Sequence, residues 1–523
     1  MGDRRFAGRR TSVVALIGVV ALALAAGAAC AAAAQEQGEQ RMGDPMDGQF
    51  WRAQVLEELI PLWYEHVRDT EHGGFYLNLS RDWQPQPPFD KMPAMLSRQV
   101  FSFSAAYLLS GDQRYLEAAR QGADYIMEHA WDSTYGGWYS LLTEDGQPKE
   151  TTKQVAEQLY TNVGLALYYL TTGDERARAR VEESVRIWRT HGHDPEFGGY
   201  YLSLNRDLTV KDDSKGKHAH YGYVGSLLLN LWLATRDPAI LDYSRELTDL
   251  TIGRMMDARN GWVYGFGVSQ DRKWQPIPVE GRPQMLIGAQ LTAALSFLRL
   301  YHQTGVAEYR DQGRALGDLA ARWGYNPRTG AWIDYVAQDP PHEPRKEANA
   351  SWWIQNYGAF LNLQLYDITH EAAYLEGFRQ TEAFFLRHMV DREYGGVFST
   401  VSAAGEMVDD GRKASPWRTS YHEVEHGLLN YLYLNLYVNH QPAVLHFMLD
   451  GGPEGRTHFV SPVDDPRVTV SAVRLDGEEW TQYDAAARAV RLPPGCGHRV
   501  EVTLSAVPAS ADTPVPAPKE ERR

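Results

Sequence analysis

Apolar residues recur every three or four positions along most of the chain, which is the spacing of helices that bury one face. In FSFSAAYLLSGDQRYLEAARQGADYIMEHAW the pattern breaks at Ser110-Gly111, so it predicts two helices joined by a short turn. The same pattern returns four more times, and single helices near 48–68 and 417–438 complete the series. The pattern therefore predicts twelve helices in six pairs.

A glycine motif separates successive pairs, as in DTEHGGFYLNLSRD and DSTYGGWYSLLTEDG. Each copy is typical of a short β-hairpin, because glycine tolerates the dihedral angles of tight turns. The copies lie 62 to 69 residues apart, at Gly74, Gly137, Gly199, Gly261, Gly330 and Gly396. Six such units close most simply into two concentric rings, so we predict an all-α (α/α)6 barrel over 48–438. An open helical solenoid fits less well, since its repeats are about 34 residues long and carry no hairpin.

Both ends of the chain differ from this repeat. After His440, short alternating runs such as RVTVSAVRL predict a small β domain over 440–507, and the Pro-rich segment 508–523 is expected to be a disordered tail. At the other end, arginines precede an uncharged run over 11–34, which is typical of a signal peptide at about 1–35. We therefore expect a periplasmic or secreted protein, with lipidation at Cys30 left open.

Composition narrows the classes of partner. The net charge of -15 argues against nucleic acid, whose binders gather Lys and Arg on one face, and we expect no membrane span in the mature chain. Once the signal peptide is removed, Cys496 would have no partner for an intramolecular disulfide. The 15 Trp and 29 Tyr favour a carbohydrate ligand, since aromatic rings pack on the apolar faces of sugars. The sequence leaves open whether the protein forms a homodimer.

In a helical ring, hairpins and the starts of the inner helices surround one mouth, where a funnel-shaped site is expected. Positions 23 to 26 residues after each repeat glycine should line it: Arg98, Tyr160, Tyr223, Met285, Trp353 and His422. Trp352, Trp353 and Trp417 lie in polar surroundings, in NASWWIQN and SPWRTSYHE, so we expect them to contact a sugar rather than to fill the core.

Three segments resemble motifs of the N-acylglucosamine 2-epimerase and cellobiose 2-epimerase family. PAMLSRQVFSFSAAY resembles the first inner-helix motif, SWWIQNYGAFLNLQLY the WW-P-Q segment, and SPWRTSYHEVEHGLLNYL the final W-x-x-x-Y-H motif. The resemblance covers about 48–438 and leaves out the β domain. It implies a sugar epimerase or isomerase that needs no cofactor or metal and acts on a mono- or oligosaccharide at C2, through an enediolate.

The resemblance also assigns roles to residues. It makes His422 the catalytic acid/base, because an imidazole exchanges protons near neutral pH, and makes Arg98 the group that stabilises the oxyanion. Trp353 and Trp417 would hold the sugar. The secondary substrate-binding residues would be Tyr160, Tyr223, His220, Tyr421 and Gln355.

The fourth inner helix departs from the family pattern. There the family has a G-H-x-I-E-A-like motif with a second catalytic histidine, whereas this chain has PQMLIGAQL. Met285, or Ile287 in a shifted register, takes the histidine position, and Gly288 or Gln290 takes that of the acid. Neither Met285 nor Ile287 can transfer a proton.

The third inner helix departs as well. The family pattern N-x-H-x-H is met by KHAHYGY, where Tyr221 and Tyr223 align with the histidines and His218 and His220 lie one turn earlier. The second acid/base is thus left open between Tyr223, His220 and another residue. A different chemistry on the same barrel also remains open.

Several other functions are compatible with parts of the sequence. A glycoside hydrolase would need two carboxylates, with Glu157, Glu423, Glu425 and Asp213 as candidates. A polysaccharide lyase could use Arg98, Tyr223 and His422, and a non-catalytic sugar-binding protein would need no second acid/base.

Two motifs suggest metals but fit less well. The segment His422 to His426 reads H-E-x-x-H, yet a zinc protease also needs a third ligand and an adjacent strand. The hairpin acids lack the closely spaced oxygens of a calcium loop, so we expect them to be turn and cap residues: Asp69, Asp132, Asp194 and Asp391.

Overall fold

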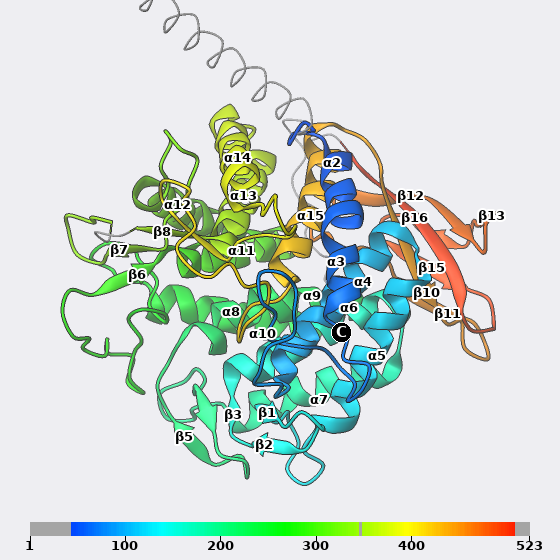
Figure 1. Cartoon of the computed structure of the whole chain (residues 1–523), viewed down its shortest axis with the longest axis horizontal. Helices are drawn as coiled ribbons and strands as arrows, with labels where there is room; N and C mark the ends of the chain where they lie inside the picture. The colour runs from blue at the N-terminus through cyan, green and yellow to red at the C-terminus, as the bar shows by residue number, and fades with distance from the viewer. Residues whose placement is uncertain (1–42, 345–347, 508–523) are drawn as a thin grey trace, which may run out of the picture.

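A computed structural model describes residues 43–344 and 348–507. The predicted signal peptide and the predicted tail lie outside the described residues. The described part has two concentric layers of helices with a small β domain on one side (Figure 1). The predicted (α/α)6 barrel is confirmed, and within the described residues no helix is both long and apolar enough to cross a membrane.

Six helical segments form the inner layer; a π-helical turn interrupts the third, and another ends the sixth. They are α4 (Pro93–Ser110), α6 (Val155–Thr172), α8, η3 and α9 (Tyr221–Tyr223, Val224–Leu228, Leu229–Thr235), α11 (Ile287–Thr304), α13 (Trp352–Thr369), and α15 with η6 (Tyr421–Tyr433, Leu434–Val438). Helices enclose these segments on all sides, and α4 accordingly buries 17 of its 18 residues. The ring closes because α15 packs against α4.

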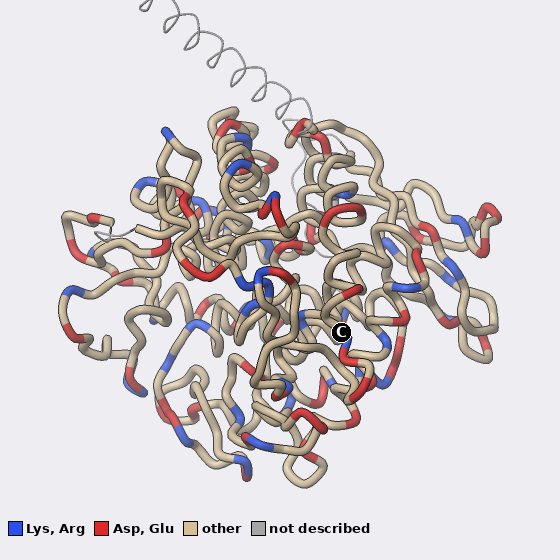
Figure 2. Tube along the Cα trace, in the orientation of Figure 1, with Lys and Arg blue, Asp and Glu red and all other residues tan. Residues whose placement is uncertain are grey.

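Six outer segments surround this layer. They are α2, η1 and α3 (Gly48–Ala53, Gln54–Leu59, Ile60–His66), α5 (Gln113–His129), α7 (Glu175–His191), α10 with η4 (Pro238–Leu250, Thr251–Met255), α12 (Ala307–Gly324), and α14 with η5 (Ala372–Phe384, Phe385–Met389). Each buries one apolar stripe, and α5 buries only 8 of its 17 residues. Acidic and basic residues are interspersed over the exposed loops and outer helices (Figure 2).

The glycine hairpins join each outer helix to the next inner one. Gly73 and Gly74 have φ angles of 81° and 66°, a conformation that disfavours other residues. Short antiparallel strands continue the hairpins and pair as β1-β2, β3-β4-β5, β6-β7 and β8-β9. They are β1 (Leu141–Leu142), β2 (Pro148–Glu150), β3 (Lys153–Gln154), β4 (Ser203–Leu204), β5 (Val210–Asp212), β6 (Gln284–Leu286), β7 (Tyr335–Ala337), β8 (Asn349–Ser351) and β9 (Thr400–Ser402).

A buried aspartate–lysine pair fastens four of the hairpins. Asp69 accepts backbone N–H groups from Glu71 and His72, and its other oxygen lies 2.5 Å from Lys91 Nζ. The remaining pairs are Asp132–Lys153, Asp194–Lys215 and Asp391–Lys413. In each pair the lysine supplies the cation beside the carboxylate, so these acids serve as turn and ion-pair residues.

The β domain closes the end of the barrel away from the hairpins. Its two antiparallel sheets have the strand orders β10-β16-β12-β13 and β11-β15-β14. The strands are β10 (Ala443–Leu449), β11 (Arg456–Phe459), β12 (Val468–Leu475), β13 (Glu478–Glu479), β14 (Tyr483–Asp484), β15 (Ala489–Leu492) and β16 (His498–Ala506). β10 contacts α4 and α6, and β11 contacts α9.

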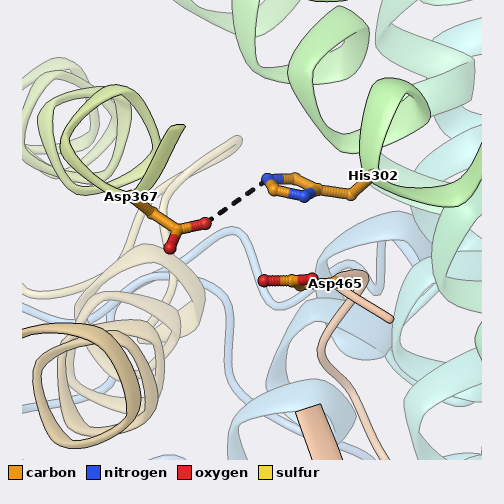
Figure 3. A group of neighbouring side chains, drawn as sticks. All are labelled: His302, Asp367 and Asp465. Carbon is orange, nitrogen blue, oxygen red and sulfur yellow. Dashed lines mark ion pairs between the residues drawn. The ribbon is translucent and has the colours of Figure 1, made fainter. Parts of the chain in front are cut away.

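The loop between β11 and β12 anchors this domain through buried charges. Side chains of His302 on α11, Asp367 on α13 and Asp465 in the loop point toward one another (Figure 3), with potential ligand atoms within 4.8 Å. The same guanidinium nitrogen of Arg467 lies 2.5 Å from Asp367 and 2.6 Å from Asp465. This one cation bridges the two carboxylates, so the group is an ionic clamp between barrel and β domain.

Candidate functional site

A cavity of about 340 Å³ opens among the starts of the inner helices, at the hairpin end of the barrel. Among the described residues, its lining contains no Asp or Glu. The polar and aromatic side chains that matter most are Arg98, Tyr160, Lys217, Trp353, Trp417 and His422. The cavity therefore combines two cations, an imidazole and aromatic surfaces.

His422 is the second residue of α15, and this places its imidazole at the cavity wall. Its Nδ1 lies 3.2 Å from Glu425 Oε2, and Glu425 also accepts a hydrogen bond from the Tyr421 hydroxyl at 2.9 Å. Burial lowers the pKa of His422 to about 4, although the Glu425 carboxylate opposes this shift. At neutral pH the ring is uncharged, and with Nδ1 donating to Glu425, Nε2 can accept a proton.

Arg98 projects from α4 into the same cavity. Its Nη1 donates to the backbone carbonyl of Trp417 at 3.3 Å, and its guanidinium lies 3.8 Å from the centre of the Tyr160 ring. Within the described residues no carboxylate pairs with Arg98, and its buried Nε has no hydrogen-bond partner. Its charge is therefore available to an anionic oxygen of a ligand.

Aromatic side chains form the rest of the wall. The Trp353 indole lies 6.0 Å from the His422 ring with an angle of 30° between their planes. Trp417 stands at the rim with 40% of its surface exposed, and its ring lies 6.2 Å from Tyr160. Such faces suit a sugar ring near His422.

Lys217, which the sequence analysis did not single out, also lines the cavity. It begins the 3-10 turn η2 (Lys217–Ala219), and its Nζ lies 5.1 Å from the centre of the Trp353 ring. Burial and then the charge of Arg98 lower the pKa of Lys217 to about 7. Its neighbour His218 lies in the cavity as well, and burial lowers the pKa of His218 to about 3.

Four predicted site residues do not border this cavity. His220 uses both ring nitrogens in the core: Nδ1 bonds the Gly216 carbonyl at 2.9 Å, and Nε2 accepts the N–H of Tyr200 at 3.2 Å. Tyr223 is buried beside Tyr243. The side chains of His220 and Tyr223 therefore lie outside this cavity, and the substrate contacts expected for them stay predictions.

The other two support the site from behind. Gln355 accepts the backbone N–H of Trp332 and donates to its carbonyl, which fastens a hairpin, so its amide is engaged there and its expected substrate contact stays a prediction. Tyr421 is 1% exposed and does not line the cavity; its hydroxyl donates to Glu425, and its ring centre lies 5.2 Å from the Arg98 guanidinium.

At the start of the fourth inner helix, the Trp353 indole packs directly against the backbone. Met285 is buried in β6, and Leu286 borders the cavity. A Cβ atom at Gly288 would lie 2.2 Å from the Trp353 ring, so the indole fills the space that a side chain would need there. Gln290 fastens the hairpin at Val263 and is not a substitute for the acid.

The carboxylates considered for glycoside hydrolysis are engaged elsewhere. Glu423 accepts a hydrogen bond from the indole of Trp63 at 3.2 Å, and Glu157 is hydrogen-bonded to Ser140. Asp213 is exposed on a loop. Glu425 contacts His422 and lines the adjoining cavity deeper in the barrel, which shares Ser226, Thr292 and Tyr357 with the site, so no pair of these acids faces the site cavity.

The H-E-x-x-H segment does not assemble a metal site. His426 Nε2 lies 2.6 Å from Glu382, within the core, whereas His422 faces the cavity. Glu423 is occupied by Trp63. The two histidines therefore have different partners and do not converge on one point.

Comparison with known proteins agrees with this geometry. The family model N-acylglucosamine 2-epimerase (GlcNAc 2-epimerase) matches residues 73–425. The cellobiose 2-epimerase of Ruminococcus albus is 31% identical over 385 residues, which cover 71% of this chain and 95% of that protein. The D-mannose isomerase of Marinomonas mediterranea is 21% identical over 385 residues, which cover 70% of this chain and 93% of that protein.

A solved structure shares the fold. The cellobiose 2-epimerase of Spirochaeta thermophila superposes with a TM-score of 0.66 at 22% sequence identity, covering 74% of this chain and 96% of that chain. The shared part accounts for the barrel, and the matched family segment ends at 425, before the β domain begins. On the extent of the family match and the identity to the Ruminococcus protein, this chain belongs to the N-acylglucosamine 2-epimerase family.

Proposed function

We propose that this protein is a sugar epimerase or isomerase that acts at C2 of an aldose. Its relatives are 2-epimerases and an isomerase, which supports this reaction class. The observation that carries the proposal is that an uncharged His422 and an Arg98 without an acidic partner line one cavity, whose described lining contains no carboxylate.

The chemistry follows from these two groups. Nε2 of His422 takes the proton from C2 of the open-chain sugar, and the electron pair of that bond forms the C1–C2 double bond of an enediolate. The guanidinium of Arg98 balances the negative charge that develops on O1. Trp353 and Trp417 hold the sugar by its apolar faces, and this geometry fixes C2 near the imidazole.

A hydrolase fits the cavity less well. Cleavage of a glycosidic bond uses two carboxyl groups on either side of the bond, about 5 to 10 Å apart. The described lining offers none, and Glu425 is held behind His422. An imidazole and two cations suit an enediolate better than an oxocarbenium ion.

A panel of sugars tests the proposal. The protein is incubated with glucose, mannose, N-acetylmannosamine and cellobiose, and the products are identified by chromatography. We expect a C2 epimer or the matching ketose from at least one sugar, no product with His422→Gln, and full activity with His191→Gln, which changes an exposed outer-helix histidine. Cleavage of an oligosaccharide, or equal activity of His422→Gln, would refute it.

We further propose that the protein is exported. The support is the arginine-led apolar run of the first 35 residues described above. N-terminal sequencing of protein from the periplasm or medium should find a start near residue 35, or at Cys30 if the chain is a lipoprotein. Intact protein confined to the cytoplasm would contradict export.

A further inference from the structure

Lys217 differs from every other buried lysine of the described residues. Five lysines are buried, and four of them pair with the hairpin aspartates: Lys91, Lys153, Lys215 and Lys413. The fifth is Lys217, whose side-chain amine has no hydrogen bond or ion pair within the described residues, and the charged group that shifts its pKa is Arg98, also a cation. An unpaired buried cation destabilises a fold, so a functional reason for this lysine is required.

The surroundings of Lys217 direct its amine to the cavity. Its Nζ lies 5.1 Å from the centre of the Trp353 ring and 5.9 Å from that of Phe266. The Trp353 ring is also 6.0 Å from His422, so both groups flank the same indole. Lys217 precedes the third of the six inner helices and His422 begins the sixth, and in a closed ring of six the third and sixth members face each other across the centre.

The site otherwise lacks a partner for His422. An epimerisation needs a proton taken from one face of C2 and another delivered to the opposite face. Met285 cannot transfer a proton, and His220 and Tyr223 lie in the core. Lys217 and His218 remain as the titratable nitrogen groups besides His422 and Arg98 that line the described cavity.

We propose that Lys217 is the second catalytic acid/base of this site, acting on the face of the sugar opposite His422. The proposal rests on the function proposed above. His422 removes the C2 proton while the carbonyl electrons move to O1 beside Arg98. The ammonium of Lys217 then gives a proton to C2, the C1–C2 double bond returns its electrons to that carbon, and the C1 carbonyl reforms. The neutral amine and the protonated imidazole exchange protons with water and so return to their starting states.

The titration of the two candidates favours Lys217 over His218. A pKa of about 7 leaves both the ammonium and the amine populated at neutral pH, as an acid/base that works in both directions requires. A histidine whose pKa is about 3 is almost never protonated at that pH, so His218 is a poor proton donor. Neighbouring cations and burial are known means of activating a lysine in this way.

The test follows each epimer separately in D2O. Wild type should exchange H2 of both the starting sugar and its C2 epimer. Lys217→Arg keeps the charge but cannot release a proton, so we expect it to slow conversion at least about 100-fold with KM nearly unchanged. Lys217→Arg should exchange H2 of one epimer only, and His422→Gln should exchange H2 of the other only. In the pH profile of kcat, the limb near pH 7 seen with wild type should be absent with Lys217→Arg. Lys211→Arg, on an exposed strand nearby, is the matched control.

Several results would overturn the inference. One is that Lys217→Arg or Lys217→Gln, each with a native circular dichroism spectrum, retains H2 exchange of both epimers or loses both equally. A second is that His218→Gln also loses H2 exchange of one epimer only, as expected for Lys217→Arg. A third is that borohydride traps the sugar on Lys217 as a secondary amine, which would indicate a Schiff base instead of proton transfer. Failure of the proposed function is distinguishable, because in that case the wild type itself exchanges no H2.

Discussion

The Nδ1 atom of His422 lies 3.2 Å from the Glu425 carboxylate, one turn further along α15. This contact fixes the ring and leaves Nε2 directed at the cavity. Glu425→Gln should therefore lower kcat by at least about tenfold, because the amide no longer stabilises the imidazolium that forms during proton transfer. Tyr421→Phe, which removes only the other hydrogen bond to Glu425, should have a smaller effect.

The pH profile provides the check on this role. Burial lowers the pKa of His422 to about 4, so the ring remains a competent base until the pH falls toward that value. The Glu425 carboxylate raises this pKa against the effect of burial, and its loss in Glu425→Gln should move the acid limb of kcat/KM to lower pH. A shift to higher pH, or no shift, would contradict the assignment.

Arg98 is held by contacts that a lysine cannot reproduce. Its planar guanidinium lies against Tyr160 and donates to the carbonyl of Trp417, and an ammonium would lose the stacked geometry. We expect Arg98→Lys to lower kcat/KM about 100-fold in steady-state assays. Arg114→Lys, on an exposed helix start, should be silent. Activity of Arg98→Lys within twofold of wild type would exclude the oxyanion role.

The unpaired Lys217 should reduce the stability of the fold. Its pKa is about 7 in the folded protein and 10.5 as the reference value, so between these limits the unfolded chain binds more protons and stability rises with pH. Lys217→Met should thus raise Tm by about 3 °C at pH 7, and the difference should shrink toward pH 10. Lys91→Met, which leaves Asp69 unpaired, should instead lower Tm. Calorimetry at pH 7 and pH 10 measures these Tm values, and a lower Tm for Lys217→Met than for wild type at pH 7 would contradict a destabilising Lys217.

The β domain should stabilise the barrel through Asp464. Arg299 on α11 lies 2.5 Å from this carboxylate, and both side chains are largely buried. Asp464→Asn leaves the guanidinium without a counter-charge, so the free energy of unfolding should fall by about 3 kcal/mol and Tm by about 5 °C. Asp410→Asn, which breaks an exposed pair with Arg412, should change Tm by less than about 1 °C. Equal effects of the two substitutions would exclude a buried anchor.

Repeats made the fold predictable from the sequence. The glycine hairpins and the helix pairs recur at nearly constant spacing, and a closed ring is the simplest packing of six such units. Counting from the glycines also placed Arg98, Tyr160, Trp353 and His422 at one mouth, where the structure brings them together. Periodicity gives the face of a helix, and that was sufficient for these four.

The remaining positions depended on partners that no local pattern specifies. Gln355 follows the paired tryptophans, yet its amide is used by the backbone of a hairpin about two dozen residues earlier. His220 likewise bonds the backbone of Gly216 and Tyr200. Lys217 resembles Lys215 in the sequence, and only the tertiary structure shows that Lys215 meets Asp194 while Lys217 meets none.

The central claim is proton transfer at C2, and proton NMR in D2O observes it directly. The protein is mixed with each sugar of the panel, and the H2 resonance is followed with and without His422→Gln. We predict loss of the H2 signal and appearance of a C2 epimer or ketose carrying deuterium. With His422→Gln no product should form, and H2 should persist in the epimer that His422 deprotonates. Product that keeps its original hydrogen, or cleavage of a glycosidic bond without exchange at C2, would contradict it.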